Sequence, residues 1–149
     1  MREIPRPLRT ALVFFMSGMA YFILELLWRG WSHPAMVAVG GMCFLAVGNV
    51  RQELSGRPLW LQMLLGAAVI AGLEGTSGCV LNLWLGLDIW DYSQMPGNLL
   101  GQVCPQYTAL WFLLCLPVLK ADSWLERTCV AVELPLFRRR RLRRERQEV

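Results

Sequence analysis

The sequence predicts an all-α integral membrane protein with four transmembrane helices. Of its 149 residues, 55% are hydrophobic and only 17% are charged, whereas soluble domains carry about 25% charged residues. The apolar residues gather in four long stretches, and most basic residues lie near the two ends of the chain. We therefore expect one membrane domain over residues 1–137, followed by a basic cytoplasmic tail over residues 138–149.

Each apolar stretch approaches or exceeds the length needed to cross a bilayer. An α-helix rises about 1.5 Å per residue, so about 20 residues cross a hydrocarbon core of about 30 Å. The expected spans cover residues 10–28, 35–50, 59–85 and 98–119. The second is slightly short and the third slightly long, which favours a tilted third helix. Pro34 and Pro58, each close to a glycine, mark the first two connections.

The residues after the fourth span predict a helix that lies in the membrane interface. Between residues 120 and 137, apolar side chains such as Trp124 and Val132 recur at near-helical spacing opposite charged ones. Seven arginines follow between Arg138 and Arg146, and we expect them to attract anionic lipid headgroups. Nucleic-acid binding is the rival interpretation of such a run, but a membrane flank explains the charges, so no nucleic-acid partner is expected.

The distribution of basic residues predicts the orientation. Cytoplasmic loops carry an excess of lysine and arginine. Of the 15 basic residues, Arg29 alone falls in a connection between spans one and two or spans three and four. Both termini should therefore be cytoplasmic, with the connections near residues 29–34 and 88–97 facing outward.

Two glutamates inside the expected spans are the main functional candidates. An ionisable group at that depth costs several kcal/mol unless a partner or a water-filled cavity receives it. At a rise of about 1.5 Å per residue, Glu25 lies about 9 Å and Glu74 about 3 Å outward of the midplane. Glu74 borders a stripe of small residues that includes Ala71 and Gly75, and such a stripe favours close helix packing. The expected outward-facing substrate or ion pocket comprises Glu25, Arg29, His33, Glu74, Asn82, Asp91, Tyr92, Ser93, Asn98 and Gln102.

Several of these residues also have a purely structural interpretation. Glu25 could pair with Arg29, four residues further on. Glu74 could be a structural hydrogen-bonding group, and His33 could be an interfacial loop residue. Asp91 and Ser93 could form only a capped turn. These alternatives stay open at the level of the sequence.

The sequence carries no specific catalytic or metal-binding signature. It contains no phosphate-binding loop, no nucleophile elbow and no His-Glu-x-x-His motif. The five cysteines are scattered without a Cys-x-x-Cys pair, which is typical of small apolar residues in spans. No cofactor and no catalytic residue are expected. The carboxylates and His33 could hold a cation, whose identity the sequence leaves open.

The polar residues and their spacing resemble the putative ABC-transporter type IV family, also called CmpB-like, and a related vertebrate transmembrane family. The resemblance rests on Glu25, residues 29–34, Gly40, Gly41, Glu74, Gly78, Asn82, residues 90–93, Pro96, Asn98, Gly101, Gln102 and Trp111. It covers all four spans but not the arginine-rich tail. Such proteins are common in Gram-positive bacteria, so the resemblance implies a multi-pass protein of a bacterial plasma membrane.

The resemblance implies a permease-like transport component. Because these residues contain no nucleotide-binding loop, such a component would need a separate ATPase subunit, a homo-oligomer or both. Two alternatives remain: a membrane-embedded enzyme acting on a lipid or lipid-linked substrate, and an assembly or regulatory partner in a membrane complex.

Overall fold

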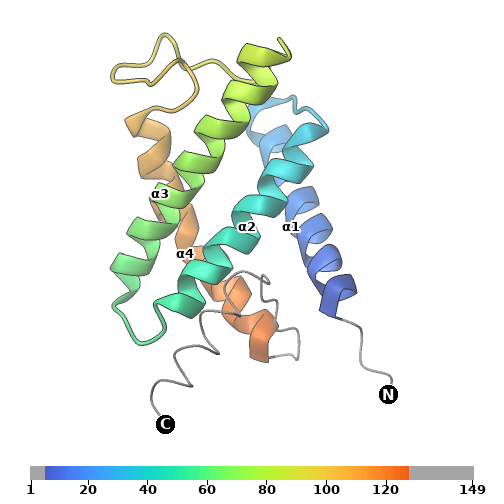
Figure 1. Ribbon diagram of the computed structural model, residues 1–149, viewed down its shortest axis with the longest axis vertical. Coiled ribbons are helices and arrows are strands. Elements are labelled where there is room, and N and C mark those ends of the chain that lie inside the picture. Colours follow the sequence, from blue (N-terminus) through green and yellow to red (C-terminus); the bar gives the residue numbers. More distant parts are fainter. Residues whose placement is uncertain (1–5, 128–149) are drawn as a thin grey trace.

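The computed structural model describes residues 6–127, which form four long helices (Figure 1). They are α1 (Arg6–Arg29), α2 (Ala35–Glu53), α3 (Leu59–Gly78) and α4 (Pro105–Arg127), and the short π-helix η1 (Cys79–Trp84) continues α3. All four helical segments are long and apolar enough to cross a membrane, with α3 and η1 forming one segment of 26 residues. The prediction of an all-helical protein, with four helices long and apolar enough to span a membrane, is confirmed over the described residues.

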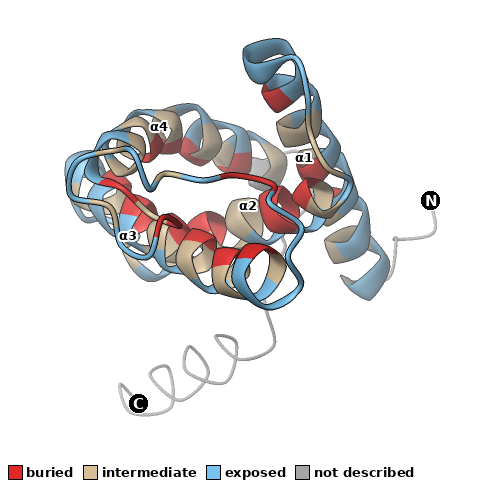
Figure 2. Ribbon diagram, turned by 90° about the horizontal axis from the view of Figure 1, so that it is seen from above, coloured by how far each residue is buried: buried red, intermediate tan, exposed pale blue. Residues whose placement is uncertain are grey.

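The helices alternate in direction. The α1–α2 connection and the loop of residues 85–104 lie at one end of the molecule, hereafter the loop end (Figure 1). The start of α1, the α2–α3 connection and the end of α4 lie at the opposite end (Figure 1). The helices α2, α3 and α4 pack against one another, whereas α1 packs mainly along α2 and lies to one side of the other three (Figure 2).

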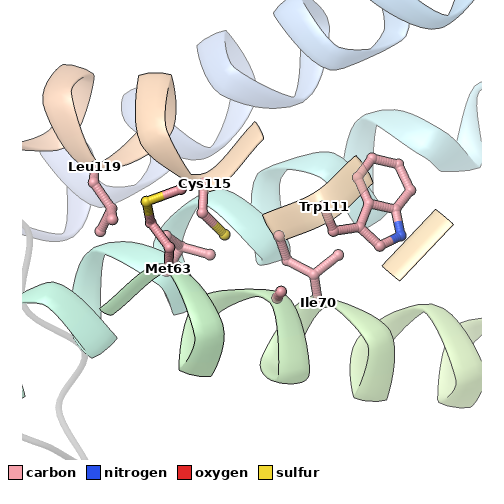
Figure 3. Close-up of a cluster of buried hydrophobic side chains, with 7 residues drawn as sticks. Met63, Ile70, Trp111, Cys115 and Leu119 are labelled. Carbon is pink, nitrogen blue, oxygen red and sulfur yellow. The ribbon is translucent and has the colours of Figure 1, made fainter. Parts of the chain in front are cut away.

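The main apolar core lies between α2, α3 and α4 (Figure 3). Its buried members are Val47, Met63, Ala67, Ile70, Trp111, Cys115 and Leu119. Outside this core, large apolar side chains such as Phe15 and Leu27 of α1 remain exposed. An apolar outer surface of this kind fits a multi-pass membrane protein, whose helices contact lipid.

Three glycines allow α1 and α2 to approach very closely. A Cβ atom added at Gly18 would lie only 2.0 Å from the carbonyl oxygen of Val37 on α2. Added Cβ atoms at Gly40 and Gly41 would lie 2.6 Å from Tyr21 and Phe14 of α1, respectively. Glycine therefore determines the distance between these two helices, as small residues do in membrane helix pairs generally.

An ion pair joins α2 to α4 at the end opposite the loop end. Arg51 Nε lies 2.6 Å from Asp122 Oδ2, and Asp122 is buried. Gly48, one turn before Arg51, makes room for this carboxylate, because an added Cβ would lie 2.8 Å from Asp122 Oδ1. The pair fixes the last turns of α4 against α2.

Replacing Asp122 with alanine should destabilise the protein by about 3 kcal/mol, because the half-buried guanidinium of Arg51 loses the carboxylate that it pairs with. The thermal midpoint in detergent should fall clearly, whereas Ser123→Ala at the next position should leave it nearly unchanged. Combining Asp122→Leu with Arg51→Met should recover part of the loss, since both charges are then removed. If Asp122→Ala and Ser123→Ala melted alike, the ion pair would contribute nothing to stability.

The helix boundaries differ from the expected spans in three places. The fourth helix begins at Pro105 and not near residue 98, so Asn98 and Gln102 precede it instead of opening it. The positive φ angles of Leu100 and Gly101 interrupt any helix there, and proline is well suited to the first helical position. The first helix begins earlier than expected, at Arg6, and the second runs on to Glu53.

The expected boundary between span four and an interfacial helix is also absent, because α4 continues without interruption from Pro105 to Arg127. Polar and charged residues such as Lys120 and Asp122 are compatible with a helix, although they lower the mean hydropathy that marked residue 119 as the end of the span. The remainder of the expected interfacial helix and the basic tail over residues 138–149 lie outside the described residues.

Candidate functional site

Glu74 lies in the middle of the buried face of α3. Met63, Ala67 and Ile70 precede it on this face, and Gly78 follows it, at helical spacings of three and four residues. The sequence placed Glu74 at the border of a small-residue stripe that included Ala71 and Gly75. Those two residues are only half-buried, so the carboxylate is more central than the stripe indicated.

Both oxygens of the Glu74 carboxylate accept hydrogen bonds from aromatic side chains. The Tyr92 hydroxyl donates to Oε1 over 2.9 Å, and the indole Nε1–H of Trp111 donates to Oε2 over 2.9 Å. The Tyr92 ring stacks on Tyr107, with centroids 4.6 Å apart. Both donors are neutral, and neither ion pair of the described part of the chain includes Glu74.

Tyr92 comes from the loop of residues 85–104 and is a reliable donor. Its burial, together with the nearby Glu74 carboxylate, raises the pKa of its phenol well above the ordinary value. The hydroxyl therefore keeps its proton at physiological pH. The contact ties the loop to the middle of the membrane domain.

Asn82 attaches the same loop to the end of the third span. Its side-chain amide donates to the carbonyl of Trp90 over 2.9 Å and to Gln102 Oε1 over 2.8 Å. Its Oδ1 accepts from the backbone N–H of Ile89 over 2.8 Å. Asn82 lies within η1, and π-helical turns of this kind occur frequently at functional sites. Its three hydrogen bonds hold the loop of residues 85–104 against the end of the third span.

Glu25 and Arg29 form the ion pair that their spacing allows. Arg29 Nη1 donates to Glu25 Oε1 over 2.8 Å, and Arg29 Nη2 donates to the carbonyl of Ile89 over 2.9 Å. The Ser32 hydroxyl donates to the second carboxylate oxygen. Glu25 is only 6% exposed, whereas the Arg29 side chain is 33% exposed, so this pair connects α1 to the loop of residues 85–104 from a partly exposed position.

The remaining expected site residues organise the loops around the site. Asp91 accepts hydrogen bonds from the backbone N–H and the hydroxyl of Ser93, which is the capped turn that the sequence allowed. Asn98 accepts from the N–H of Gly101 and donates to the carbonyl of Met95. His33 Nδ1 accepts from the N–H at the start of α2. The side chains of Ser93 and His33 thus bond to residues only two positions away in the sequence.

A groove runs between α1 and α4, towards the loop end. It consists of two cavities of about 370 Å³ and 490 Å³. Both cavities are lined by Tyr21, Leu24, Trp90, Trp111 and Leu114. We call this feature the α1–α4 groove. It exists because α1 packs along α2 and leaves the side facing α4 uncovered.

The two parts of the α1–α4 groove differ chemically. The smaller cavity is almost entirely apolar, with Glu74 as its one acidic side chain. The larger cavity, at the loop end, is lined by Glu25, Arg29 and Asp91 among aromatic rings. The structure therefore brings Glu25, Arg29, Glu74, Asp91 and Tyr92 to one groove, whereas Asn82 and Gln102 act behind it.

The sequence-based reasoning missed the part played by aromatic residues of α4. Tyr107 and Trp111 lie one turn apart on α4 and line the groove, and Trp111 is a direct partner of Glu74. Their spacing of four residues on the same helix was the available signal. Among the described residues, no group of three or more His, Cys, Asp or Glu side chains could hold a metal ion.

Comparison with known proteins identifies a family for this chain. A family model described as "Putative ABC-transporter type IV" matches residues 12–132, which covers most of α1 and all of α2, α3 and α4. This match confirms the family resemblance noted in the sequence; it does not address the vertebrate relative. Neither the curated proteins nor the solved structures include a significant match to the chain.

Proposed function

The chain belongs to the Putative ABC-transporter type IV family, and from this premise we propose that it is a membrane component of a transporter that binds substrate in the α1–α4 groove. The observation that carries the proposal is Glu74. A carboxylate within a membrane span needs a proton, a cation or water to offset its charge. Here it is held by two neutral donors at the wall of an open groove, where a substrate could reach it.

The proposed orientation places the loop end outside the cell. In the described part of the chain, Arg9, Arg51, Arg57 and Lys120 belong to segments at the opposite end, whereas Arg29 is the basic residue at the loop end. The positive-inside rule makes the end with more basic residues cytoplasmic. The wider, more polar part of the groove would then open towards the outer surface of the plasma membrane.

A separate ATPase subunit is the proposed energy source. The 149 residues contain no phosphate-binding loop of the Walker type. At the proposed cytoplasmic end, a polar cavity of about 440 Å³ lies between the α2–α3 connection and the end of α4, and Ser55, Gln62 and Ser123 help to line it. This cavity offers a partner protein a recessed surface that is formed by residues of α2, α3 and α4.

Replacing Glu74 with glutamine should abolish transport while leaving the fold intact. The amide keeps the shape of the side chain and one of its two acceptor oxygens, but it removes the charge. We expect a deletion strain to show an altered distribution of at least one metabolite between cells and medium, and the native gene to restore it. Glu74→Gln should restore less than about one tenth of the native effect, since an intramembrane charge acts directly on its ligand.

The matched control is Thr76→Val, on the exposed side of the same helix, where the hydroxyl bonds only to the backbone of its own helix. It should restore the native distribution at equal protein level. Full restoration by Glu74→Gln would remove Glu74 from the mechanism. A deletion strain with no altered distribution of any metabolite would contradict a role in transport.

A further inference from the structure

The larger cavity of the α1–α4 groove combines aromatic rings with an excess of carboxylates. Six aromatic side chains line it: Tyr21, Trp28, Trp90, Tyr92, Tyr107 and Trp111. The charged side chains of its lining are Glu25, Asp91 and Arg29, which gives a formal charge of −1. The Glu74 carboxylate lies in the adjoining cavity, bonded to Tyr92 and Trp111.

The one cation of this lining is already engaged. Arg29 bonds to Glu25 and to the carbonyl of Ile89, and its guanidinium lies 6.0 Å from the ring centroid of Trp31. An anionic ligand would therefore have to compete with Glu25 for the guanidinium while lying close to Asp91. A cationic ligand meets the opposite situation, because carboxylates and the faces of aromatic rings both attract positive charge.

The smaller cavity suits an apolar portion of such a ligand. Its walls are apolar side chains of α1, α2 and α4, including Phe44, Leu114 and Val118. It adjoins the aromatic cavity and extends from the loop end along the spans, as an acyl chain does in a bilayer leaflet. A molecule with a charged head and a hydrocarbon tail matches both cavities in one orientation.

We propose that the α1–α4 groove binds an amphiphile with a single ammonium headgroup and a hydrocarbon chain. The headgroup occupies the larger, aromatic cavity beside Glu74 and Asp91. The chain occupies the smaller, apolar cavity between α1 and α4. The inference rests on the proposed function, because it takes the groove as the substrate site and names the substrate class.

The test is quenching of tryptophan fluorescence by brominated amphiphiles in a neutral maltoside detergent. Trp90 and Trp111 line both cavities, so a chain bound in the apolar cavity lies beside two fluorophores. A brominated alkyltrimethylammonium should quench saturably at a concentration at least about tenfold below that of a brominated alkyl sulfate of equal chain length, since the carboxylates and rings favour only the cation. A brominated alkyl maltoside reports quenching by mere partition into the micelle.

Two pairs of variants assign the effect to the site. Glu74→Gln should weaken binding of the cation about tenfold, and Thr76→Val should not change it. Tyr107→Leu removes a ring and should weaken binding, whereas Tyr107→Phe keeps the ring and should bind as the native protein does. The Tyr107 pair keeps the test decisive if Glu74→Gln folds poorly.

Three results would overturn the inference. One is equal quenching by the cationic, anionic and neutral probes. Another is tighter binding of the alkyl sulfate. The third is a dimer, measured by light scattering, that excludes all three probes, because the groove would then hold a second copy of the chain. A failure of this kind, together with loss of metabolite transport in Glu74→Gln, would reject the ligand class and leave the transport role standing. Specific binding of the cation without any transport defect in the deletion strain would support the ligand class and reject the transport role.

Discussion

Replacing Gly18 with alanine should detach α1 from α2 and greatly reduce the yield of folded protein. The added methyl group would lie 2.0 Å from the carbonyl oxygen of Val37, which is far inside van der Waals contact. The obstacle is backbone, so no change of rotamer can relieve it. We expect a loss at or above the upper end of the range for overpacking, about 3 kcal/mol.

The matched control is Gly72→Ala on α3, where an added Cβ would meet no heavy atom within 4 Å. Alanine favours the helical conformation over glycine by about 1 kcal/mol, so this variant should be as stable as the native protein or slightly more so. Thermal midpoints and monodisperse yields in detergent measure both variants. Equal values for the two would show that α1 and α2 are further apart than the structure places them.

Replacing Asn82 with leucine should release the loop of residues 85–104. The apolar side chain has a similar size but forms none of the hydrogen bonds to Ile89, Trp90 and Gln102. An unsatisfied buried polar group costs about 1–3 kcal/mol, and three groups lose a partner at once. Hydrogen exchange should then show the amides of this loop exchanging at least about 100-fold faster, since about 2.7 kcal/mol corresponds to a factor of 100.

Asn49→Leu is the control for this experiment. Asn49 is also buried, but its amide donates only to the carbonyl of Leu45 in its own helix, and its Oδ1 has no partner. Its replacement leaves no group of another segment unsatisfied, so protection of the loop should not change. Unchanged protection in Asn82→Leu would mean that Tyr92 and Arg29 hold the loop without the asparagine.

Hydropathy and local spacing were sufficient for the parts of this structure that depend on neighbours in the sequence. The four spans follow from apolar length. The Glu25–Arg29 pair follows from a spacing of four residues, and the turn formed by Asp91 and Ser93 follows from the chemistry of short polar side chains. Each of these features is determined within about one or two helical turns.

The parts that could not be predicted depend on contacts between distant segments. Trp111 bonds to Glu74 across 37 positions of sequence, and no local pattern pairs them. The start of α4 at Pro105 depends on positive φ angles at Leu100 and Gly101. The mean hydropathy of residues 98–119 cannot detect these angles. The groove itself depends on α1 packing along α2 alone, which is a property of the assembled helices.

The one-sided attachment of α1 makes a single helix pair responsible for the width of the groove. Gly18 lies against the backbone of α2, and Gly40 and Gly41 of α2 lie against Tyr21 and Phe14 of α1. The Arg29–Ile89 bond holds the loop end of α1. The size of molecule that fits the groove is thus set by how α1 packs on α2.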